Sequence, residues 1–145
     1  MVVIWYIIKD MSFLPKKEIF KAMKFVLPPV LWASVIFYFS SLPTVTASEF
    51  YLWDFLLKKT AHFVEYGILA ILIYRALTNY EIKKDRAKWL SILIAFLYAI
   101  TDEYHQSFVP GRGPSVRDVV IDTIGAVILL TAANKMLYWW YPANI

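Results

Sequence analysis

Four long apolar runs follow one another in this chain of 145 residues, and each is about as long as a membrane-spanning helix. They cover residues 21–43, 59–77, 88–108 and 116–141. A transmembrane helix needs about 20 mostly apolar residues. Because the runs are rich in Leu, Ile and Ala and lack the regular alternation of a barrel strand, we expect helices. The sequence therefore predicts an all-α fold, an integral membrane bundle of four transmembrane helices.

Composition agrees with a lipid environment. The chain is 60% hydrophobic and 18% charged, with a mean hydropathy of +0.55, which is too apolar for an ordinary soluble domain. The absence of cysteine excludes disulfides, a thiolate nucleophile and thiolate metal sites. The net charge of +4 does not predict a nucleic-acid partner, because the basic residues lie in blocks beside the apolar runs, as cytoplasmic flanks do.

Two regions are expected along the chain. Residues 1–20 form an N-terminal cytoplasmic or interfacial segment, whose opening MVVIWYII is too short to span a bilayer. Residues 21–145 form the transmembrane domain. Its first run also resembles a signal peptide, but Pro28 and Pro29 favour a retained helix, which they either open or kink near its start.

Polar residues gather at one end of each of the last three runs. They are His62 and Glu65 at the N-terminal end of the second run, Asp102, Glu103 and Gln106 at the C-terminal end of the third, and Asp118 and Asp122 at the N-terminal end of the fourth. Because successive membrane helices run antiparallel, these ends all fall on one side of the bilayer. Ionisable groups within a span are costly and usually face the bundle interior or a water-filled cavity. The pattern therefore predicts one polar site.

The distribution of Lys and Arg predicts the orientation. If the N-terminus is cytoplasmic, the inner segments hold 11 basic residues and the outer loops hold 4. The positive-inside rule then favours a multi-pass protein of the bacterial plasma membrane, with both termini cytoplasmic and the polar site facing outward.

The segment PGRGPS at 110–115 predicts a stiff turn between the third and fourth helices. Ser115 and Asp118 match the Ser-x-x-Asp start of a helix, so Ser115 is more readily a cap than a nucleophile. A helix N-terminus beside Arg112 is a candidate anion site. Arg112 could instead only neutralise the neighbouring carboxylates.

Three segments resemble the VanZ-like family of small bacterial membrane proteins. They are SSLP at 40–43, KTAHFVEYGIL at 59–69 and YAITDEYHQSFVPGRGPSVRDVVIDTIGA at 98–126. The matching residues are Lys59, His62, Glu65, Tyr66, Asp102, Glu103, Gln106, Pro110, Arg112, Ser115, Asp118 and Gly125. Asp122 stands where the family is expected to have asparagine. The family is named for a protein that gives low-level resistance to the glycopeptide teicoplanin, so the resemblance implies a cell-envelope role rather than a reaction.

Three classes of function fit these residues, and binding linked to glycopeptide resistance ranks first. A binding protein would hold an anionic envelope ligand, such as a lipid phosphate, a peptidoglycan-precursor carboxylate or part of a glycopeptide. Its ligand-binding residues would be Lys59, Tyr66, Gln106, Arg112, Ser115, Asp118 and Asp122. A scaffold, ranked third, would use the polar network only to fix helix register, with His62 and Glu65 satisfying each other.

A membrane hydrolase or transferase acting on a lipid-linked substrate ranks second. His62 or Glu65 would be its general base, and Asp102 or Glu103 its acid or a metal ligand. The sequence carries no complete metal motif or nucleophile elbow. No cofactor is therefore predicted, a divalent metal is left open, and the oligomeric state is not predicted.

Overall fold

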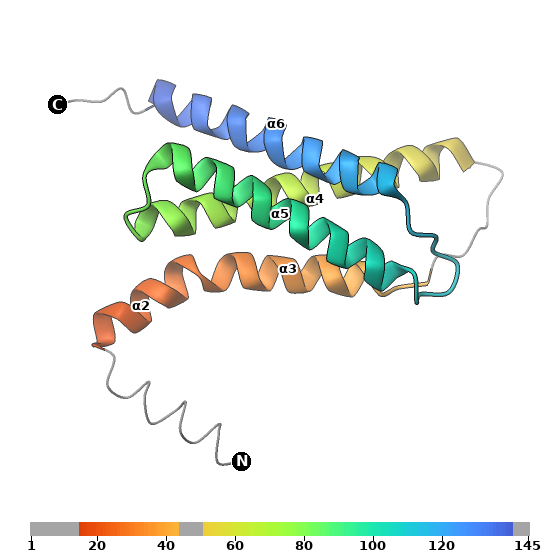
Figure 1. Cartoon of the computed structure of the whole chain (residues 1–145), viewed down its shortest axis with the longest axis horizontal. Coiled ribbons are helices and arrows are strands. Elements are labelled where there is room, and N and C mark those ends of the chain that lie inside the picture. The colour runs from red at the N-terminus through yellow and green to blue at the C-terminus, as the bar shows by residue number, and fades with distance from the viewer. Residues whose placement is uncertain (1–14, 44–50, 141–145) are drawn as a thin grey trace, which may run out of the picture.

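A computed structural model describes residues 15–43 and 51–140 of the chain, with side chains for 15–43 and 56–136. Its helices are α2 (Lys16–Phe25), α3 (Leu27–Ser40), α4 (Tyr51–Asn79), α5 (Lys84–Gln106) and α6 (Val116–Trp140). Since α2 and α3 nearly join, the described residues form four helical segments and no strand, which confirms the all-α prediction (Figure 1). Most of the expected segment 1–20 lies outside the described residues.

The first segment breaks at Val26, immediately before the prolines. Helix α2 ends at Phe25, and Pro28 and Pro29 lie in the first turn of α3. Backbone N–H groups in a first turn have no acceptor within the helix, so the missing N–H of proline costs no hydrogen bond there. The prolines therefore open a new helix, as one of the two sequence expectations had it. Within the described residues, one segment, Lys16–Ser40, is long and apolar enough by itself to cross a membrane.

Helices α4 and α5 begin earlier than the apolar runs suggest, whereas α6 begins at Val116, as predicted. Helix α4 begins at Tyr51 rather than at residue 59, and α5 begins at Lys84 rather than at residue 88. The predicted runs begin at Lys59 and Lys88, but lysine is a good helix former and does not end a helix. Hydropathy therefore located the apolar part of each helix and not its ends.

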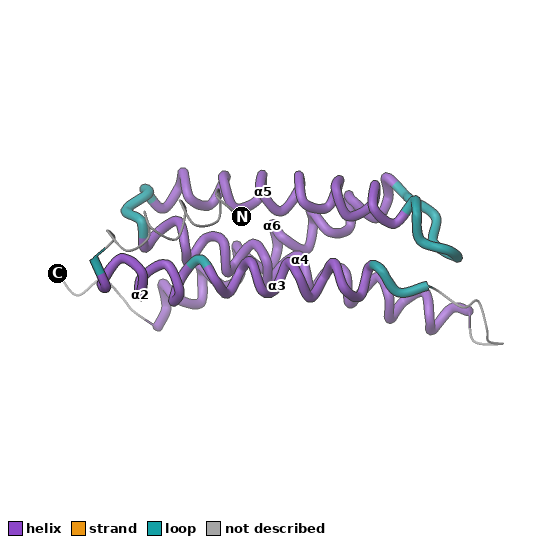
Figure 2. The backbone as a smooth tube through the Cα atoms, turned by 90° about the horizontal axis from the view of Figure 1, so that it is seen from below, coloured by secondary structure: helices purple, strands orange, loops and turns teal. Residues whose placement is uncertain are grey.

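The last three helices pack along a common axis, with α4 and α6 in closest contact (Figures 1 and 2). Gly67 of α4 faces Leu129 of α6, and Gly125 of α6 lies against the backbone carbonyl of Phe63 in α4. Small residues at such contacts let helix backbones approach closely, as is common in membrane bundles. Buried residues on these helices, with Ile36 of α3, form the core: Ile36, Tyr66, Leu69, Ala70, Ile73, Ile92, Ala95, Ala99, Ala126 and Leu130.

Helix α3 joins this core partly through side chains that bond to backbone carbonyls. The Trp32 indole N–H donates to the carbonyl of Glu65 at 2.9 Å, and the Tyr98 hydroxyl donates to the carbonyl of Ala33 at 2.6 Å. Ser41, just after α3, contacts His105 of α5 at 3.0 Å. These bonds tie α3 to both α4 and α5.

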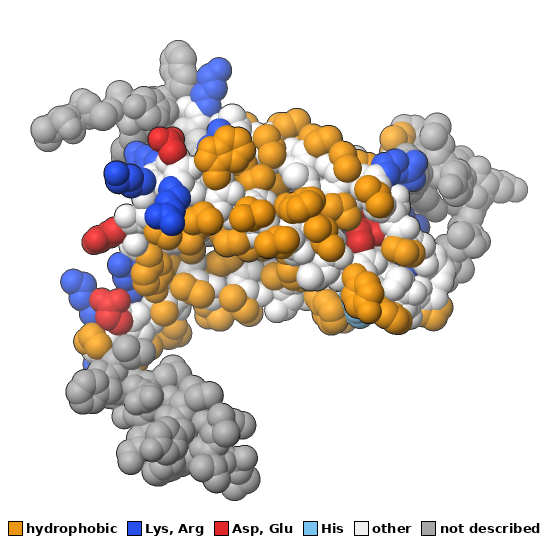
Figure 3. All heavy atoms as spheres, viewed as in Figure 1, with side chains coloured by type: hydrophobic (Ala, Val, Ile, Leu, Met, Phe, Trp, Pro, Cys, Tyr) orange, Lys and Arg blue, Asp and Glu red, His pale blue; other side chains and the backbone are white. Residues whose placement is uncertain are grey.

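The outward faces of the helices are apolar. Large hydrophobic side chains are exposed along α3, α5 and α6, among them Leu31, Phe37, Leu93, Leu97, Val127 and Ile128. Figure 3 shows hydrophobic side chains across the middle of the molecule and Lys and Arg side chains gathered at the end where α2 lies. A soluble monomer rarely exposes so continuous an apolar surface, whereas a lipid bilayer would cover it.

Candidate functional site

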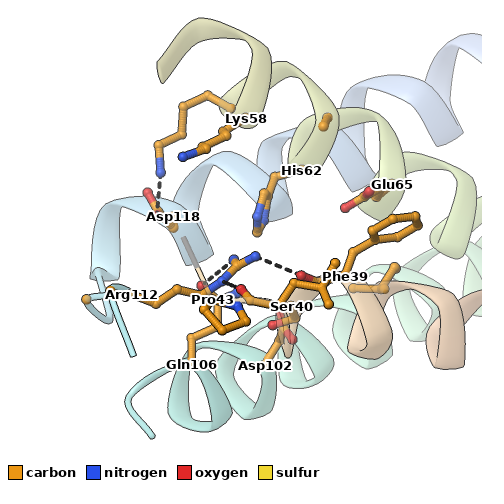
Figure 4. A pocket seen from close by; sticks show the side chains of 16 residues that line it. Phe39, Ser40, Pro43, Lys58, His62, Glu65, Asp102, Gln106, Arg112 and Asp118 are labelled. Carbon is orange, nitrogen blue, oxygen red and sulfur yellow. Dashed lines mark hydrogen bonds and ion pairs between the residues drawn. The ribbon is translucent and has the colours of Figure 1, made fainter. Parts of the chain in front are cut away.

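Four helix ends meet at the end of the bundle opposite α2. They are the C-terminal ends of α3 and α5 and the N-terminal halves of α4 and α6, and they frame a cavity of about 410 Å³ (Figure 4). The polar residues that line it are Ser40, Lys58, Lys59, His62, Glu65, Asp102, Gln106, Arg112 and Asp118. Its apolar wall consists of Ile36, Phe39, Leu42 and Pro43, at or just after the end of α3.

A tight turn places Arg112 at this cavity. The Arg112 backbone N–H donates to the carbonyl of Val109 at 3.1 Å, and Gly111 between them has φ 77°. Pro110 followed by a glycine with positive φ is the pattern of a type II turn, in which glycine meets no steric cost. The predicted stiff turn is therefore observed, and it brings the guanidinium beside the cavity.

The Arg112 guanidinium holds the end of α3. Nε donates to the carbonyl of Leu42 at 3.0 Å, Nη2 donates to the carbonyl of Phe39 at 2.7 Å, and Nη1 donates to Oε1 of Gln106 at 3.2 Å. Gln106 in turn donates from Nε2 to Oδ2 of Asp102 at 2.9 Å. Within the described chain Arg112 thus reaches a carboxylate through Gln106 and forms no direct ion pair.

The start of α6 is held differently from the expected capping box. The backbone N–H of Ser115 donates to Oε2 of Glu103 on α5 at 2.7 Å. Asp118, which a capping box would direct at that N–H, instead pairs with Nζ of Lys59. A lysine on the neighbouring helix offers Asp118 a full opposite charge, which is a stronger partner than a neutral amide. Glu103 therefore takes the capping role predicted for Asp118.

His62 and Asp122 form a pair beside the cavity. Nδ1 of His62 lies 3.4 Å from Oδ1 of Asp122, a distance suited to an ion pair but longer than a regular hydrogen bond. Asp122 is 1% exposed, whereas His62 is half-buried and lines the cavity. Asp122 therefore does not line the cavity, and it touches the cavity only through its pairing with His62.

Several buried carboxylate oxygens lack a hydrogen-bond partner among the described residues. They are Oδ1 of Asp102, Oε1 of Glu103, Oδ1 of Asp118 and both oxygens of Asp122. Most buried polar atoms in native proteins are paired. Across residues 15–43 and 56–136, no group of three or more His, Asp or Glu side chains is arranged to hold a metal ion.

The predicted site residues fall into two groups. Those that line the cavity are Lys59, His62, Glu65, Asp102, Gln106, Arg112 and Asp118, and those that adjoin it without lining it are Tyr66, Glu103, Ser115 and Asp122. Sequence reasoning missed Lys58, which also lines the cavity. Its signal was its spacing, since residues four and seven apart share one face of a helix and Lys58 precedes His62 and Glu65 by those intervals.

A family model described as VanZ/LLP1 matches residues 2–138. All five described helices begin within that range, and every residue that lines the cavity lies inside it. No curated protein and no solved structure matches the chain.

Proposed function

Because that match covers nearly the whole chain, the chain belongs to the VanZ/LLP1 family, and we propose that it binds an anionic ligand of the bacterial cell envelope. We further propose that its four helical segments all span the plasma membrane, with both termini cytoplasmic and the cavity facing outward. The apolar outer surface supports a multi-pass arrangement. The gathering of Lys and Arg at the end opposite the cavity supports this orientation.

The observation that carries the binding proposal is the pair of cationic side chains on different walls of the cavity. Lys58 is exposed on α4, and no described residue forms a hydrogen bond or ion pair with its ammonium. Arg112 approaches from the loop (Figure 4), with three N–H groups used out of the five that a guanidinium offers. A phosphate or carboxylate between them would meet both cations. Envelope ligands with such groups include lipid phosphates, peptidoglycan-precursor peptides and glycopeptides, and a glycopeptide ligand would account for teicoplanin resistance.

The geometry gives less support to a scaffold. A network that served only to fix helix register would be expected to satisfy its own buried polar atoms. Here carboxylate oxygens of Asp102 and Asp122 are buried without a hydrogen-bond partner in the described chain.

A membrane hydrolase or transferase is the second candidate, because His62 and Asp122 have the arrangement of a general base and its orienting group. A carboxylate behind one ring nitrogen fixes the histidine and leaves the other nitrogen to accept a proton. Turnover of a lipid-linked phosphate that His62→Gln and Asp122→Asn both abolish would favour the enzyme over simple binding.

The binding proposal can be tested by native mass spectrometry of the detergent-purified chain with phosphatidylglycerol as the anionic probe. We expect Lys58→Gln to reduce the bound lipid at least fivefold, because the unpaired cation of the cavity is lost. Lys83→Gln, at the opposite end of the bundle, is the matched control and should bind like the wild type. Equal lipid binding by wild type and Lys58→Gln would refute an anion site in this cavity.

A further inference from the structure

The cavity carries free charges of opposite sign at its two ends. Lys58 and Glu65 both line it and lie seven residues apart on α4, which separates them by two turns and about 10 Å along the helix. No described residue donates a hydrogen bond to the Glu65 carboxylate or pairs with it, and the same holds for the Lys58 ammonium. Figure 4 shows Lys58, His62 and Glu65 in succession along α4, with Arg112 facing this row from the other side.

A second carboxylate strengthens the acidic end. Asp102 is 3% exposed and lines the cavity. Its Oδ2 accepts a hydrogen bond from Gln106, but its Oδ1 has no hydrogen-bond partner among the described residues. The Tyr66 hydroxyl lies close to Asp102, but no hydrogen bond of regular geometry joins the two. This end therefore has one half-buried and one buried carboxylate with spare acceptor oxygens.

The nearby cations do not satisfy these carboxylates. Arg112 directs three N–H groups at the carbonyls of Phe39 and Leu42 and at Gln106. His62 turns Nδ1 to Asp122, and Lys59 pairs with Asp118. An uncompensated buried carboxylate is costly, so a ligand that brings a positive charge to this end would be favoured.

From this arrangement we infer that the cavity binds a zwitterionic group, with a phosphate or carboxylate at Lys58 and Arg112 and a primary ammonium at Glu65 and Asp102. The inference rests on the proposed function, since it adds a positive charge to the anionic ligand proposed for the same cavity. A primary ammonium has three N–H donors. Glu65, Oδ1 of Asp102 and the buried hydroxyl of Ser40 offer acceptors for all three at that end.

The apolar wall indicates how such a group would be presented. Ile36, Phe39 and Leu42 line one side of the cavity, and Phe39 and Leu42 are also exposed on the outer surface of the bundle. Apolar chains attached to a zwitterionic headgroup could leave the cavity along this side. A phospholipid with a phosphoethanolamine headgroup has both charges and such apolar chains. A soluble phosphoethanolamine ester has the same two charges but no apolar chains.

The test compares lipids that differ in one charge. The full-length chain is purified in detergent and examined by native mass spectrometry with phosphatidylethanolamine, with N-acetylated phosphatidylethanolamine, which keeps the phosphate but loses the ammonium, and with phosphatidylglycerol. We expect at least tenfold more phosphatidylethanolamine to be retained than either of the other lipids. This comparison uses the wild-type chain, so it does not depend on the folding of any variant.

Variants then locate the ammonium. Glu65→Gln and Asp102→Asn should each lower retention of phosphatidylethanolamine to the level of the N-acetylated lipid while leaving retention of phosphatidylglycerol unchanged. Glu18→Gln on α2 removes an exposed carboxylate at the opposite end and should change nothing. Competition by glycerophosphoethanolamine at the same concentration as the lipid would support a soluble zwitterion, and its failure would support the lipid.

Two results would overturn the inference. Equal retention of phosphatidylethanolamine and its N-acetylated form would show that the ammonium is not recognised. Unchanged retention of phosphatidylethanolamine in both Glu65→Gln and Asp102→Asn would show that it does not bind at this end. In either case, reduced retention of phosphatidylglycerol by Lys58→Gln would still support the proposed anion site. The two proposals therefore fail separately.

Discussion

At the scale of single residues, Arg112 links the loop between α5 and α6 to the end of α3. Its guanidinium donates to two backbone carbonyls, those of Phe39 and Leu42, and to the side chain of Gln106. A planar fork of N–H groups can serve several acceptors at once, which a lysine ammonium on a flexible stem does poorly. Arg112 is therefore a positioning residue for α3 as well as a cation beside the cavity.

We expect Arg112→Lys to loosen α3 although the positive charge remains. The carbonyl acceptors are near the surface, where water can replace part of the lost bonding, so the cost should be about 1 to 3 kcal/mol for the hydrogen bonds involved. Thermal unfolding in detergent, followed by circular dichroism, measures it. Arg86→Lys at the opposite end is the control. An unchanged unfolding temperature would mean that these bonds do not hold α3.

Sequence reasoning found most of the residues at the cavity but not their partners. His62, Glu65 and Asp102 followed from helical spacing and from the rule that ionisable residues in a span face inward. Two of the three acceptors of Arg112 are backbone carbonyls. Every residue type provides a backbone carbonyl, so the amino-acid sequence does not reveal these partners. The same applies to the exchange of roles between Glu103 and Asp118, since it depends on how closely Lys59 of α4 approaches α6.

At the scale of helices, the contact between α4 and α6 depends on two glycines in different surroundings. A methyl group on Gly125 would overlap the backbone carbonyl of Phe63, which cannot move without shifting α4. A methyl group on Gly67 would meet the side chain of Leu129, where a rotamer change can move the outer carbons but not Cβ, which lies 2.8 Å away. Both glycines are therefore needed for the close approach of the two helices, and the contact at Gly125 can adapt least.

We expect both Gly125→Ala and Gly67→Ala to destabilise the bundle, and Gly125→Ala to do so more, because the atoms that it would meet are all backbone. Overpacking a tight contact costs about 1 to 3 kcal/mol, whereas alanine in a helix is favoured over glycine by about 1 kcal/mol. Gly113→Ala, where the added carbon would meet nothing within 4 Å, is the control. Unfolding temperatures in one detergent rank the three variants. A Gly125→Ala protein as stable as Gly113→Ala would contradict the close packing.

The helices themselves were predictable because long apolar runs leave few alternatives to a helix in a membrane. The break before Pro28 and Pro29 was predictable for a local reason, since proline lacks the backbone N–H that a continuing helix needs. The eight residues by which α4 extends ahead of the apolar run were not, because Asp54, Lys58 and Lys59 interrupt the uncharged stretch that marks the run.

At the scale of the whole molecule, most cationic residues lie at the end of the bundle opposite the polar cavity. Lys83 in the turn before α5 and Lys84 and Arg86 in its first turn lie at one end, while the loop between α5 and α6 at the other end carries the cavity residue Arg112. Under the proposed orientation, which the positive-inside rule supports, the first end faces the cytoplasm. The cavity would then be open to the outer side of the membrane.

We expect a cysteine introduced at Gly113 to react with a membrane-impermeant thiol reagent in intact cells, and one at Lys83 to react only after the cells are opened. The chain has no cysteine of its own, so each variant carries a single reactive site. Labelling can be followed by the mass shift of the purified protein. The reverse pattern, with Lys83 labelled in intact cells, would place the cavity on the cytoplasmic side.

The break at Val26 bears on the thickness of the surrounding bilayer. Helix α3 has 14 residues, a length of about 21 Å, which is short against a hydrocarbon layer of about 30 Å. Helix α2 adds length, but its Lys21 and Lys24 ammoniums belong at headgroup level. Such a hydrophobic mismatch is relieved when lipids compress around the short helix. Under the proposed topology the membrane beside α3 would therefore be thinned, and outer headgroups would lie closer to the mouth of the cavity.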